Sequence, residues 1–388
     1  MAEYDLIVVG AGPAGQSLVA QLAGARLRIA LIDKEYESAL AAPAYDGREI
    51  ALTHKSVERL RRLGAWSNLA PDEISPIARA EVLDGGSPHV LAFADRLTHG
   101  PLGWLVPNSA IRRSLYAVVS SQANCDAYFG VAATVESIDK SGASVRLADG
   151  RELRGRLVVA ADTRFSGLRK SQGIAAHMFD FGRTMLVCRV GHTRPHDSVA
   201  TEWFDHGQTI AMLPLNGNVS SLVLTLDSGA ANALATLDET AFAREIERRT
   251  QRRWGGMTLA STRHCYPLVA TYASRFVARR FALIGDAAVG MHPVTAHGFN
   301  FGLRSAVALA DRILHAQRRG LDIAEDAGLR RYERGHRLAT MPLFAATNAI
   351  ARLYGDERRV ARVLRGAGVR AMTWTPGARR MVESSLRH

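Results

Sequence analysis

Apolar positions near the N-terminus follow the pattern of a strand, a helix and a second strand. Residues 4–9 are a short β-branched apolar run closed by Gly10, which is typical of a buried parallel strand. A helical pattern follows through residues 18–22, and a second apolar run covers 27–32. Because such units pack helices over a parallel sheet, the pattern predicts an α/β fold.

Two later regions alternate apolar and polar positions instead. They cover about 74–93 and about 185–226, where short runs such as 210–215 and 222–226 stand between turn residues. This pattern predicts strands of an antiparallel sheet. The sequence therefore contains a second kind of sheet, separate from the parallel one.

The chain between these two regions returns to the first pattern. Residues 145–153 predict a hairpin that turns at Asp149-Gly150, and residues 157–161 predict another buried strand. The α/β domain is thus expected to be interrupted by the antiparallel one and then resumed.

After Gly302 the pattern is mostly helical. It predicts helices over 303–314 and 332–370, with breaks at Pro342 and Gly355. The expected parts are a discontinuous dinucleotide-binding domain over 1–72, 100–175 and 268–318, an antiparallel-sheet substrate domain over 73–99 and 176–267, and a helical C-terminal segment over 319–388.

Length and composition limit the class of protein. A chain of 388 residues with 47% hydrophobic residues suggests two folded domains with room for a ligand between them. The three cysteines, Cys125, Cys188 and Cys265, lack the spacing of a metal site or a disulfide framework, so no metal is expected. The N-terminal apolar run is too short for a signal peptide or a membrane span, so we expect a cytoplasmic protein.

The net charge of +12 is concentrated at the C-terminal end. Residues 318–388 hold fifteen arginines against seven acids. A helix there would have an apolar face that packs on the domain or, alternatively, a basic face that attaches the protein peripherally to an anionic inner membrane. Nucleic-acid binding is not expected, since no recognised fold supports it. The apolar face carries Val360, Val363, Leu364 and Ala367, and the basic face carries Arg358, Arg362 and Arg365.

A glycine motif follows the first strand and opens the first helix. In Gly10-Ala-Gly12-Pro13-Ala14-Gly15 the glycines allow a tight turn, close approach of a pyrophosphate and close packing of helix on strand. Asp33, followed by Lys34, ends the second strand about twenty residues on, where an acid can bind ribose hydroxyls. The motif predicts a dinucleotide, and by itself leaves NAD and FAD open.

Two further acids follow buried strands. Asp162 follows the strand at 157–161, and Gly285-Asp286 follows an apolar run at 281–284. Because ligands of open α/β sheets lie at the carboxyl ends of the strands, both acids are expected near the dinucleotide, although either could merely cap a helix. Arg48 and Arg112 could bind phosphate oxygens through two parallel hydrogen bonds, or could be ordinary surface charges.

These three motifs together resemble the flavoprotein aromatic hydroxylases of the para-hydroxybenzoate hydroxylase class, whose fingerprints are GxGxxG, DG and GD. The resemblance spans nearly the full chain. Within this class, the chain most resembles the ubiquinone-biosynthesis hydroxylases. The sequence of residues 285–300 looks most like that of the branch that hydroxylates the demethoxyubiquinol ring. The matching stretches are 46–52, 108–112, 266–268 and 292–300.

The resemblance implies an FAD-dependent monooxygenase with a Rossmann-like FAD-binding domain. NAD(P)H or another donor would reduce the flavin, and O2 would form a C4a-hydroperoxide that hydroxylates an electron-rich ring of a polyprenylated phenol or quinol. The protein would position the ring and exclude water. A quinone-biosynthesis complex is a further expected partner.

The resemblance also implies the site residues. Asp286 would contact the ribityl and pyrophosphate end of FAD, and the helix that begins near Gly298 would direct its free amides at the flavin. The expected catalytic residues are His292, Pro293 and His297, although either histidine could be an ordinary buried one. The expected cofactor-binding residues are Gly10, Gly12, Pro13, Ala14, Gly15, Asp33, Lys34, Arg48, Arg112, Asp162, Gly285, Asp286, Pro293, Gly298, Phe299 and Asn300.

Three residues depart from the family pattern. Thr163 replaces the glycine of the DG motif, Val289 replaces a frequent histidine, and His297 stands within Ala-His-Gly where Gly-Gln-Gly is common. Three other interpretations therefore stay open: a hydroxylase of a soluble phenolic compound, a flavin reductase or dehydrogenase, and a non-hydroxylating flavoprotein or assembly subunit of the quinone pathway.

Overall fold

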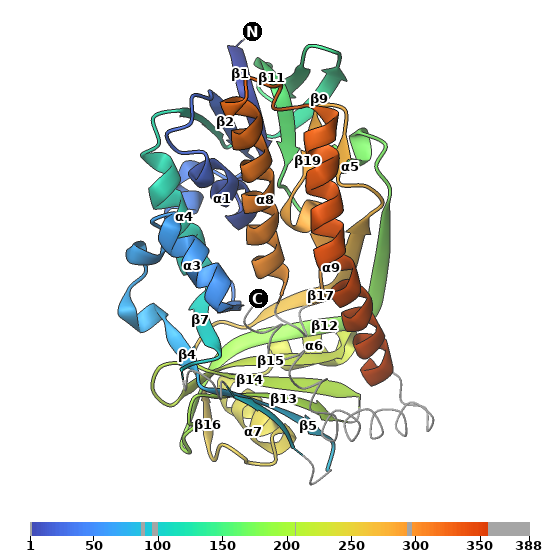
Figure 1. Cartoon of the computed structure of the whole chain (residues 1–388). Coiled ribbons are helices and arrows are strands. Elements are labelled where there is room, and N and C mark those ends of the chain that lie inside the picture. Colours follow the sequence, from blue (N-terminus) through green and yellow to red (C-terminus); the bar gives the residue numbers. More distant parts are fainter. Residues whose placement is uncertain (1, 87–89, 95–99, 206, 293–296, 356–388) are drawn as a thin grey trace.

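The computed structural model describes residues 2–86, 90–94, 100–205, 207–292 and 297–355. These residues form a parallel sheet with flanking helices in the upper half of Figure 1 and a broad, mostly antiparallel sheet in the lower half. A small third sheet lies between them. The predicted combination of a parallel-sheet domain, an antiparallel sheet and a helical C-terminal region is confirmed.

The first sheet is built on the predicted apolar runs. Its central strands pair in parallel, and the register places Leu6 beside both Leu157 and Ile29, all three fully buried. β10 (Ala143–Leu147) forms the predicted hairpin with β11, turning at Gly150, whose φ is +92°. The main strands, in spatial order, are β18 (Val277–Ala278), β19 (Phe281–Leu283), β11 (Glu152–Ala160), β1 (Ala2–Val9), β2 (Ile29–Asp33) and β8 (Cys125–Phe129), and β9 (Ala133–Ile138) pairs with β10.

Helices cover this sheet. α1 packs against α8 and α4, and α8 packs in turn against α9, which runs lengthwise beside it (Figure 1). No described helix combines the length and the apolar composition needed to cross a membrane. The helices of this half are α1 (Pro13–Gln21), α2 (Glu37–Ala41), α3 (His54–Arg62), α4 (Asn108–Ser120), α5 (Gly167–Ser171), α8 (Gly298–Arg318) and α9 (Asp326–Gly355).

The second sheet has one face covered by α6 (Ser228–Thr236) and α7 (Glu239–Arg249), which share a buried core with it. One detail departs from the predicted pattern, because β5 pairs with β13 in parallel. Its strands, in spatial order, are β20 (Val289–Gly290), β17 (His264–Ala273), β12 (Ala176–His192), β15 (Val219–Asp227), β14 (Gln208–Pro214), β13 (Val199–Asp205), β5 (Arg79–Asp84) and β6 (Leu91–Ala94), with β16 (Met257–Leu259) beside β12.

The small third sheet links the two halves. β7 (Gly103–Pro107) pairs with β3 (Glu49–Leu52) on one side and with β4 (Ser75–Ile77) on the other. Its apolar side chains pack against one end of the second sheet, where Leu105 contacts the core that includes Leu213. The chain segments that enter and leave the dinucleotide domain are thereby fixed to the antiparallel sheet.

The predicted helix break at Pro342 is wrong. α9 continues through Pro342 from Asp326 to Gly355. Proline removes one backbone hydrogen bond, to the carbonyl four residues earlier, which belongs to Leu338, a residue that is 73% exposed. Residues 356–388, with the predicted amphipathic helix, lie outside the described residues.

Candidate functional site

The turn between β1 and α1 is shaped for an anion. Gly10 has a φ of +113°, and a Cβ there would lie 2.4 Å from the Ala161 carbonyl oxygen. Gly12, the N-cap of α1, has open space around its Cβ position. No acidic residue and no side-chain cap occupies the first turn of α1, so its amides are open to a phosphate group.

Asp33 fixes this turn to the end of β2. Its Oδ2 accepts a hydrogen bond from the Ala11 amide at 2.5 Å, and its Oδ1 accepts one from the Glu35 amide at 2.8 Å. A carboxylate has about four acceptor positions, so ribose hydroxyls can still bind. Lys34 is exposed beside it.

Asp162 lies at the end of β11, where its Oδ1 is buried without a hydrogen-bond partner among the described residues. Burial raises the pKa of this carboxyl, and the Ser166 side chain opposes the shift. Thr163 is outside the left-handed region, and its Oγ1 accepts a hydrogen bond from the Phe165 amide at 3.2 Å. The turn therefore does not require the glycine of the DG motif.

Asp286 forms an ion pair that the sequence analysis missed. Arg164 donates from Nη2 to Asp286 Oδ2 at 2.9 Å and from Nη1 to the Val269 carbonyl oxygen at 2.8 Å. The only sequence signal was an arginine two residues after Asp162, at the end of a strand. Arg164 thus joins the DG-like turn, the GD turn and the second sheet.

The GD turn also touches the glycine turn of α1. Gly285 has a φ of +59°, and a Cβ there would lie 2.7 Å from Ala14 Cβ. Its amide donates to Ser305 Oγ of α8 at 2.9 Å. The strand ends of β1 and β19 and the helices α1 and α8 therefore meet at one place, as the motifs predict for a shared ligand.

Arg48 is held in a fixed orientation. Its Nε and Nη2 donate to Asp46 Oδ2 at 3.1 and 2.5 Å, and Asn108 Nδ2 donates to the same oxygen at 2.8 Å. Burial opposes ionisation of Asp46, but the hydrogen bonds from Arg48 and Asn108 keep its pKa below the ordinary value. Tyr266 Oη donates to the Asp46 carbonyl oxygen at 2.7 Å.

Arg112 contributes differently. It lies in α4, which packs on α1, and its side chain is half-buried. Its guanidinium forms no hydrogen bond or ion pair with any described residue. The structure therefore does not bring Arg112 into contact with the other expected site residues, but leaves its charge available to a ligand.

In the described part of the chain, the N-terminus of α8 is uncapped, and Asn300 in its first turn forms hydrogen bonds to another segment. Among the described residues, no atom lies within 4 Å of a Cβ position at Gly298 and no side chain caps the helix. Asn300 Nδ2 donates to the Ala51 carbonyl oxygen at 2.9 Å, and the Thr53 amide donates to Asn300 Oδ1 at 3.3 Å. Asn300 thus fastens β3 to α8, while Phe299 packs on the main core.

The two described histidines of this segment are both buried, with 8% exposure. The His292 ring lies 4.7 Å from the Phe181 ring, and burial, aided by the charge of Arg164, lowers its pKa to about 4. His292 is therefore neutral near pH 7. His297 is the N-cap of α8, with its ring 5.8 Å from that of Phe301. Pro293 lies outside the described residues.

Val289 is a core residue. It belongs to β20, is 2% exposed and pairs with Tyr272 of β17. An apolar side chain suits this position because it is enclosed between the second sheet and the main core. A histidine here would need a buried hydrogen-bond partner.

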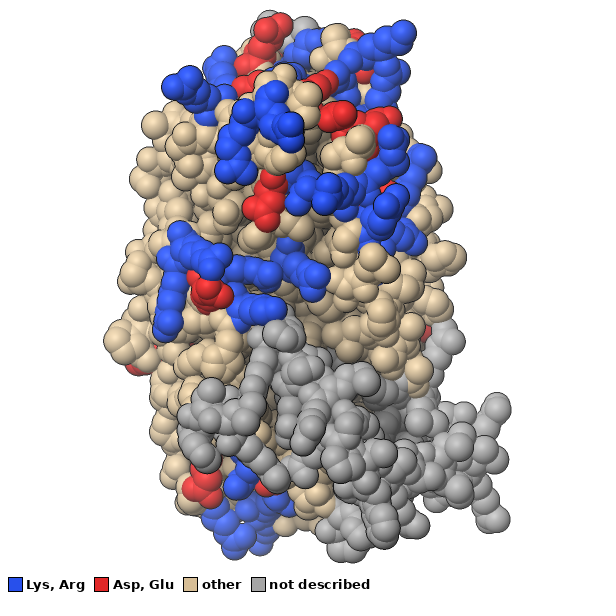
Figure 2. Space-filling view, in the orientation of Figure 1, with Lys and Arg blue, Asp and Glu red and all other residues tan. Residues whose placement is uncertain are grey.

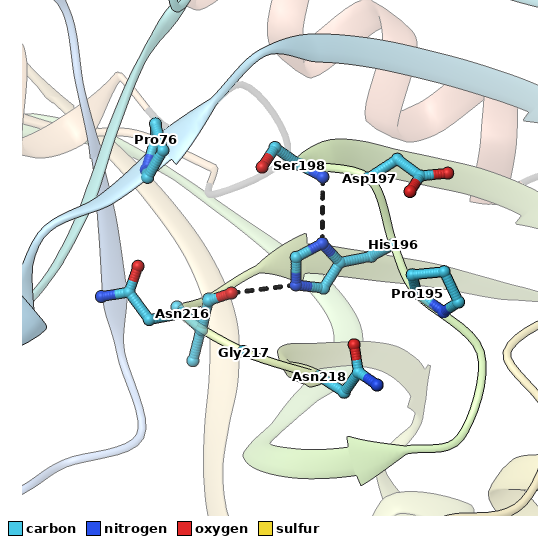
Figure 3. A pocket seen from close by; sticks show the side chains of 9 residues that line it. Pro76, Pro195, His196, Asp197, Ser198, Asn216, Gly217 and Asn218 are labelled. Atoms are coloured by element: carbon cyan, nitrogen blue, oxygen red, sulfur yellow. Dashed lines mark hydrogen bonds between the residues drawn. The ribbon is translucent and has the colours of Figure 1, made fainter.

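A cavity of about 310 Å³ lies between the segment before β13 and the turn that joins β14 to β15 (Figure 3). His196 lines it, but its Nδ1 accepts from the Ser198 amide at 3.0 Å and its Nε2 donates to the Leu215 carbonyl oxygen at 2.9 Å. Both ring nitrogens are therefore occupied. None of the expected cofactor residues lines this cavity, so it is separate from the dinucleotide site.

The residues at the strand ends fit FAD. The open amides of α1, the space at Gly12 and the buried oxygen of Asp162 all provide for a ligand that runs along these strand ends. The fold and these turns define a dinucleotide-binding α/β protein with an appended antiparallel sheet.

Comparison with known proteins identifies the family within this class. The FAD binding domain family model matches residues 3–344. Ubiquinone hydroxylase UbiM of Neisseria meningitidis is 42% identical over 98% of this chain and 84% of its own length, and ubiquinone hydroxylase UbiL of Rhodospirillum rubrum is 36% identical over 95% and 86%. The chain therefore belongs to the FAD-binding-domain family, as an FAD-dependent monooxygenase.

A solved structure supports the fold. PqsL of Pseudomonas aeruginosa, in complex with 2-aminobenzoylacetate, superposes with a TM-score of 0.79 at 21% identity, covering 93% of this chain and 99% of that one. At this identity the likeness concerns the arrangement of helices and strands alone. The resemblance and the cofactor predicted from the sequence are confirmed by the family match.

Proposed function

We propose that the enzyme hydroxylates the aromatic ring of a polyprenylated ubiquinone precursor, of the demethoxyubiquinol type. The observation that carries this proposal is the 42% identity to a ubiquinone hydroxylase across 98% of the chain. The overall reaction consumes the ring C–H, O2, NAD(P)H and a proton, and yields the ring C–OH, water and NAD(P)+. The choice of the demethoxyubiquinol ring rests on the amino-acid sequence of residues 285–300.

Each described site residue has a task in this proposal. The α1 amides beside Gly12 bind the pyrophosphate, and Asp33 accepts from the adenosine ribose. Asp286, oriented by Arg164, accepts hydrogen bonds from the ribityl chain, and Arg48 binds the flavin edge. FAD supplies the activation of oxygen when it is bound and reduced.

The start of α8 contributes electrostatics. Its uncapped amides and helix dipole favour negative charge nearby, such as the charge that a flavin ring gains on reduction. Because His292 is neutral near pH 7, it is not expected to act as a general acid. Its role in the proposal is to pack, together with Phe181, beside the flavin ring and to exclude water.

The proposal is tested by quinone-lipid profiling of a deletion strain. The strain is expected to accumulate a ring intermediate that lacks one hydroxyl or methoxyl group, and the wild-type gene is expected to restore ubiquinone. An unchanged quinone profile would contradict the proposal. Purified, FAD-loaded enzyme should also convert 2-prenylphenol to a dihydroxylated product with coupled O2 use, whereas a reductase would consume NAD(P)H without product.

A further inference from the structure

The second sheet has an apolar face that no helix of its own half covers. α6 and α7 pack on the face that carries Trp203, Ile210 and Leu224. The opposite face is turned toward the dinucleotide domain, because a Cβ at Gly47, next to Arg48, would lie 2.6 Å from Val187 Cγ2. The loop that carries Arg48 therefore rests on this second face.

Strand register defines a row of residues across that face. Val187 of β12 pairs with Val223 of β15, which pairs with Ala211 of β14, and Ala211 pairs with Glu202 of β13. Glu202 pairs in turn with Val82 of β5. Residues paired in this way lie side by side on one face of a sheet, so a single carboxyl group stands in an otherwise apolar row.

Within the described ranges, the carboxyl group of Glu202 stands alone. Its carboxylate forms no hydrogen bond or ion pair with another part of the described chain, and it is half-buried. Desolvation by burial raises its pKa to about 8. A carboxyl group in apolar surroundings is costly, and because its oxygens are not fully enclosed they are open to a polar ligand on this face.

We propose that Glu202 binds a ring hydroxyl of the aromatic substrate, an inference that rests on the proposed function. Val187, next to the Arg48 loop, and Glu202 are three strand spacings apart, about 14 Å. Val223 and Ala211 lie between these two positions, so a ring placed over them would direct its hydroxyl at Glu202 and an apolar substituent over the remaining face. The carboxyl carbonyl oxygen can accept from a phenol in either protonation state.

The matched variants are Glu202→Leu, Glu202→Gln and Glu81→Gln. Glu81 lies on the neighbouring strand β5, and its register partner Thr201 places it on the other face, where it pairs with Arg253 at 3.4 Å. Glu202→Leu removes the unpaired carboxyl, so its melting temperature is expected to rise by about 2 °C or more. Glu81→Gln provides the same chemical change without contact with the substrate face.

The probes are 2-prenylphenol and its methyl ether, with binding to FAD-loaded enzyme followed by flavin fluorescence. The wild type is expected to bind the phenol about tenfold more tightly than the ether. Glu202→Leu is expected to bind both alike and about as weakly as the wild type binds the ether. Glu202→Gln, which keeps a carbonyl acceptor, is expected to retain part of the preference, and Glu81→Gln all of it.

The outcomes separate the two proposals. A wild type that binds neither probe contradicts the proposed function and the role of Glu202 with it. A wild type that prefers the phenol, together with a Glu202→Leu variant that is folded, FAD-loaded and equally selective, overturns the role of Glu202 alone. A merely structural role of Glu202 would change the melting temperature but not the ratio of the two affinities.

Discussion

Arg164 shows how a single side chain can organise three parts of the site. It pairs with Asp286 across 122 residues of sequence and also holds the Val269 carbonyl of the second sheet. Asp286 is 38% exposed by side chain, so its orientation depends on this partner rather than on close packing. The ion pair therefore positions the acid that is expected to meet the ribityl chain.

Substitution Arg164→Met is expected to weaken FAD binding about tenfold or more, because the carboxylate loses its orienting hydrogen bonds. Titration of the apoenzyme with FAD, followed by flavin fluorescence, measures the change. Arg330→Met, which removes only an exposed pair with Asp326 on α9, is the control and should bind FAD as the wild type does. Equal FAD affinity in all three proteins would refute the role of Arg164.

His292 gives a prediction about pH. Its folded-state pKa of about 4 lies below the ordinary 6.5, so the unfolded chain binds the proton more readily between these values. The wild type should therefore lose stability through this group as the pH falls from 7 toward 4, by about 2 kcal/mol at pH 5. In His292→Gln this component is absent.

The measurement is the difference in free energy of unfolding between wild type and His292→Gln at pH 7 and at pH 5, by denaturant titration of the FAD-free proteins. All other titrating groups are shared, so the difference isolates His292. A difference that is the same at both pH values would show that His292 is not buried in the neutral form.

At the scale of elements, α1 and α8 meet the sheet through residues without side chains. A Cβ at Gly15 would lie 1.8 Å from the Gly10 carbonyl oxygen, and Gly285 and Gly302 leave room for Ala14. This close approach lets the N-termini of two helices converge on one ligand. The distance between α1 and the turn after β1 is thus limited by contact between backbone atoms of Gly15 and Gly10.

Substitution Gly15→Ala should push α1 away from this turn and abolish stoichiometric FAD loading. The matched control is Gly335→Ala in α9, where no atom lies within 4 Å of the Cβ position, and this change should stabilise the helix by about 1 kcal/mol. The ratio of flavin to protein absorbance after purification measures loading. Full loading of a folded Gly15→Ala protein would contradict the contact.

At the scale of the whole molecule, positive charge gathers on one face. Figure 2 shows basic side chains in a band over α3 and α8 and in a second group higher on this face. Arg59 of α3 and Arg304 of α8 are half-buried, and neither pairs with an acid within the described ranges. Burial and, for Arg59, the charge of Arg304 lower the pKa of these guanidinium groups.

We propose that this charge, with the arginines of 356–388, brings the enzyme to an anionic membrane that holds its apolar substrate. Co-sedimentation with vesicles of 2:1 neutral to anionic phospholipid should show binding at low salt and release at high salt, since surface attraction is screened. Replacement of Arg358, Arg362 and Arg365 by Gln should weaken binding. Replacement of the exposed Arg248, Arg252 and Arg253, in and just after α7, is the charge-matched control, and absence of binding at low salt would refute the proposal.

The sequence alone determined the features that depend on local chemistry. The turn at Gly10 to Gly15 requires glycine for reasons of φ and close approach, and apolar runs of strand length specify the buried parallel sheet. Because these constraints act over a few residues, their spacing was sufficient to predict the α/β class, the positions of Asp33 and Asp286 at strand ends, and a dinucleotide ligand. The choice of FAD came from the resemblance to the aromatic hydroxylases.

Only the tertiary structure decided which distant groups meet. The pairing of Arg164 with Asp286, the use of Asn300 to fasten β3, the parallel contact of β5 with β13 and the place of Glu202 on the apolar face all depend on register and packing between segments far apart in sequence. The residue type shows what kind of group a side chain can bind. Which group it actually meets depends on how distant segments pack together in the fold.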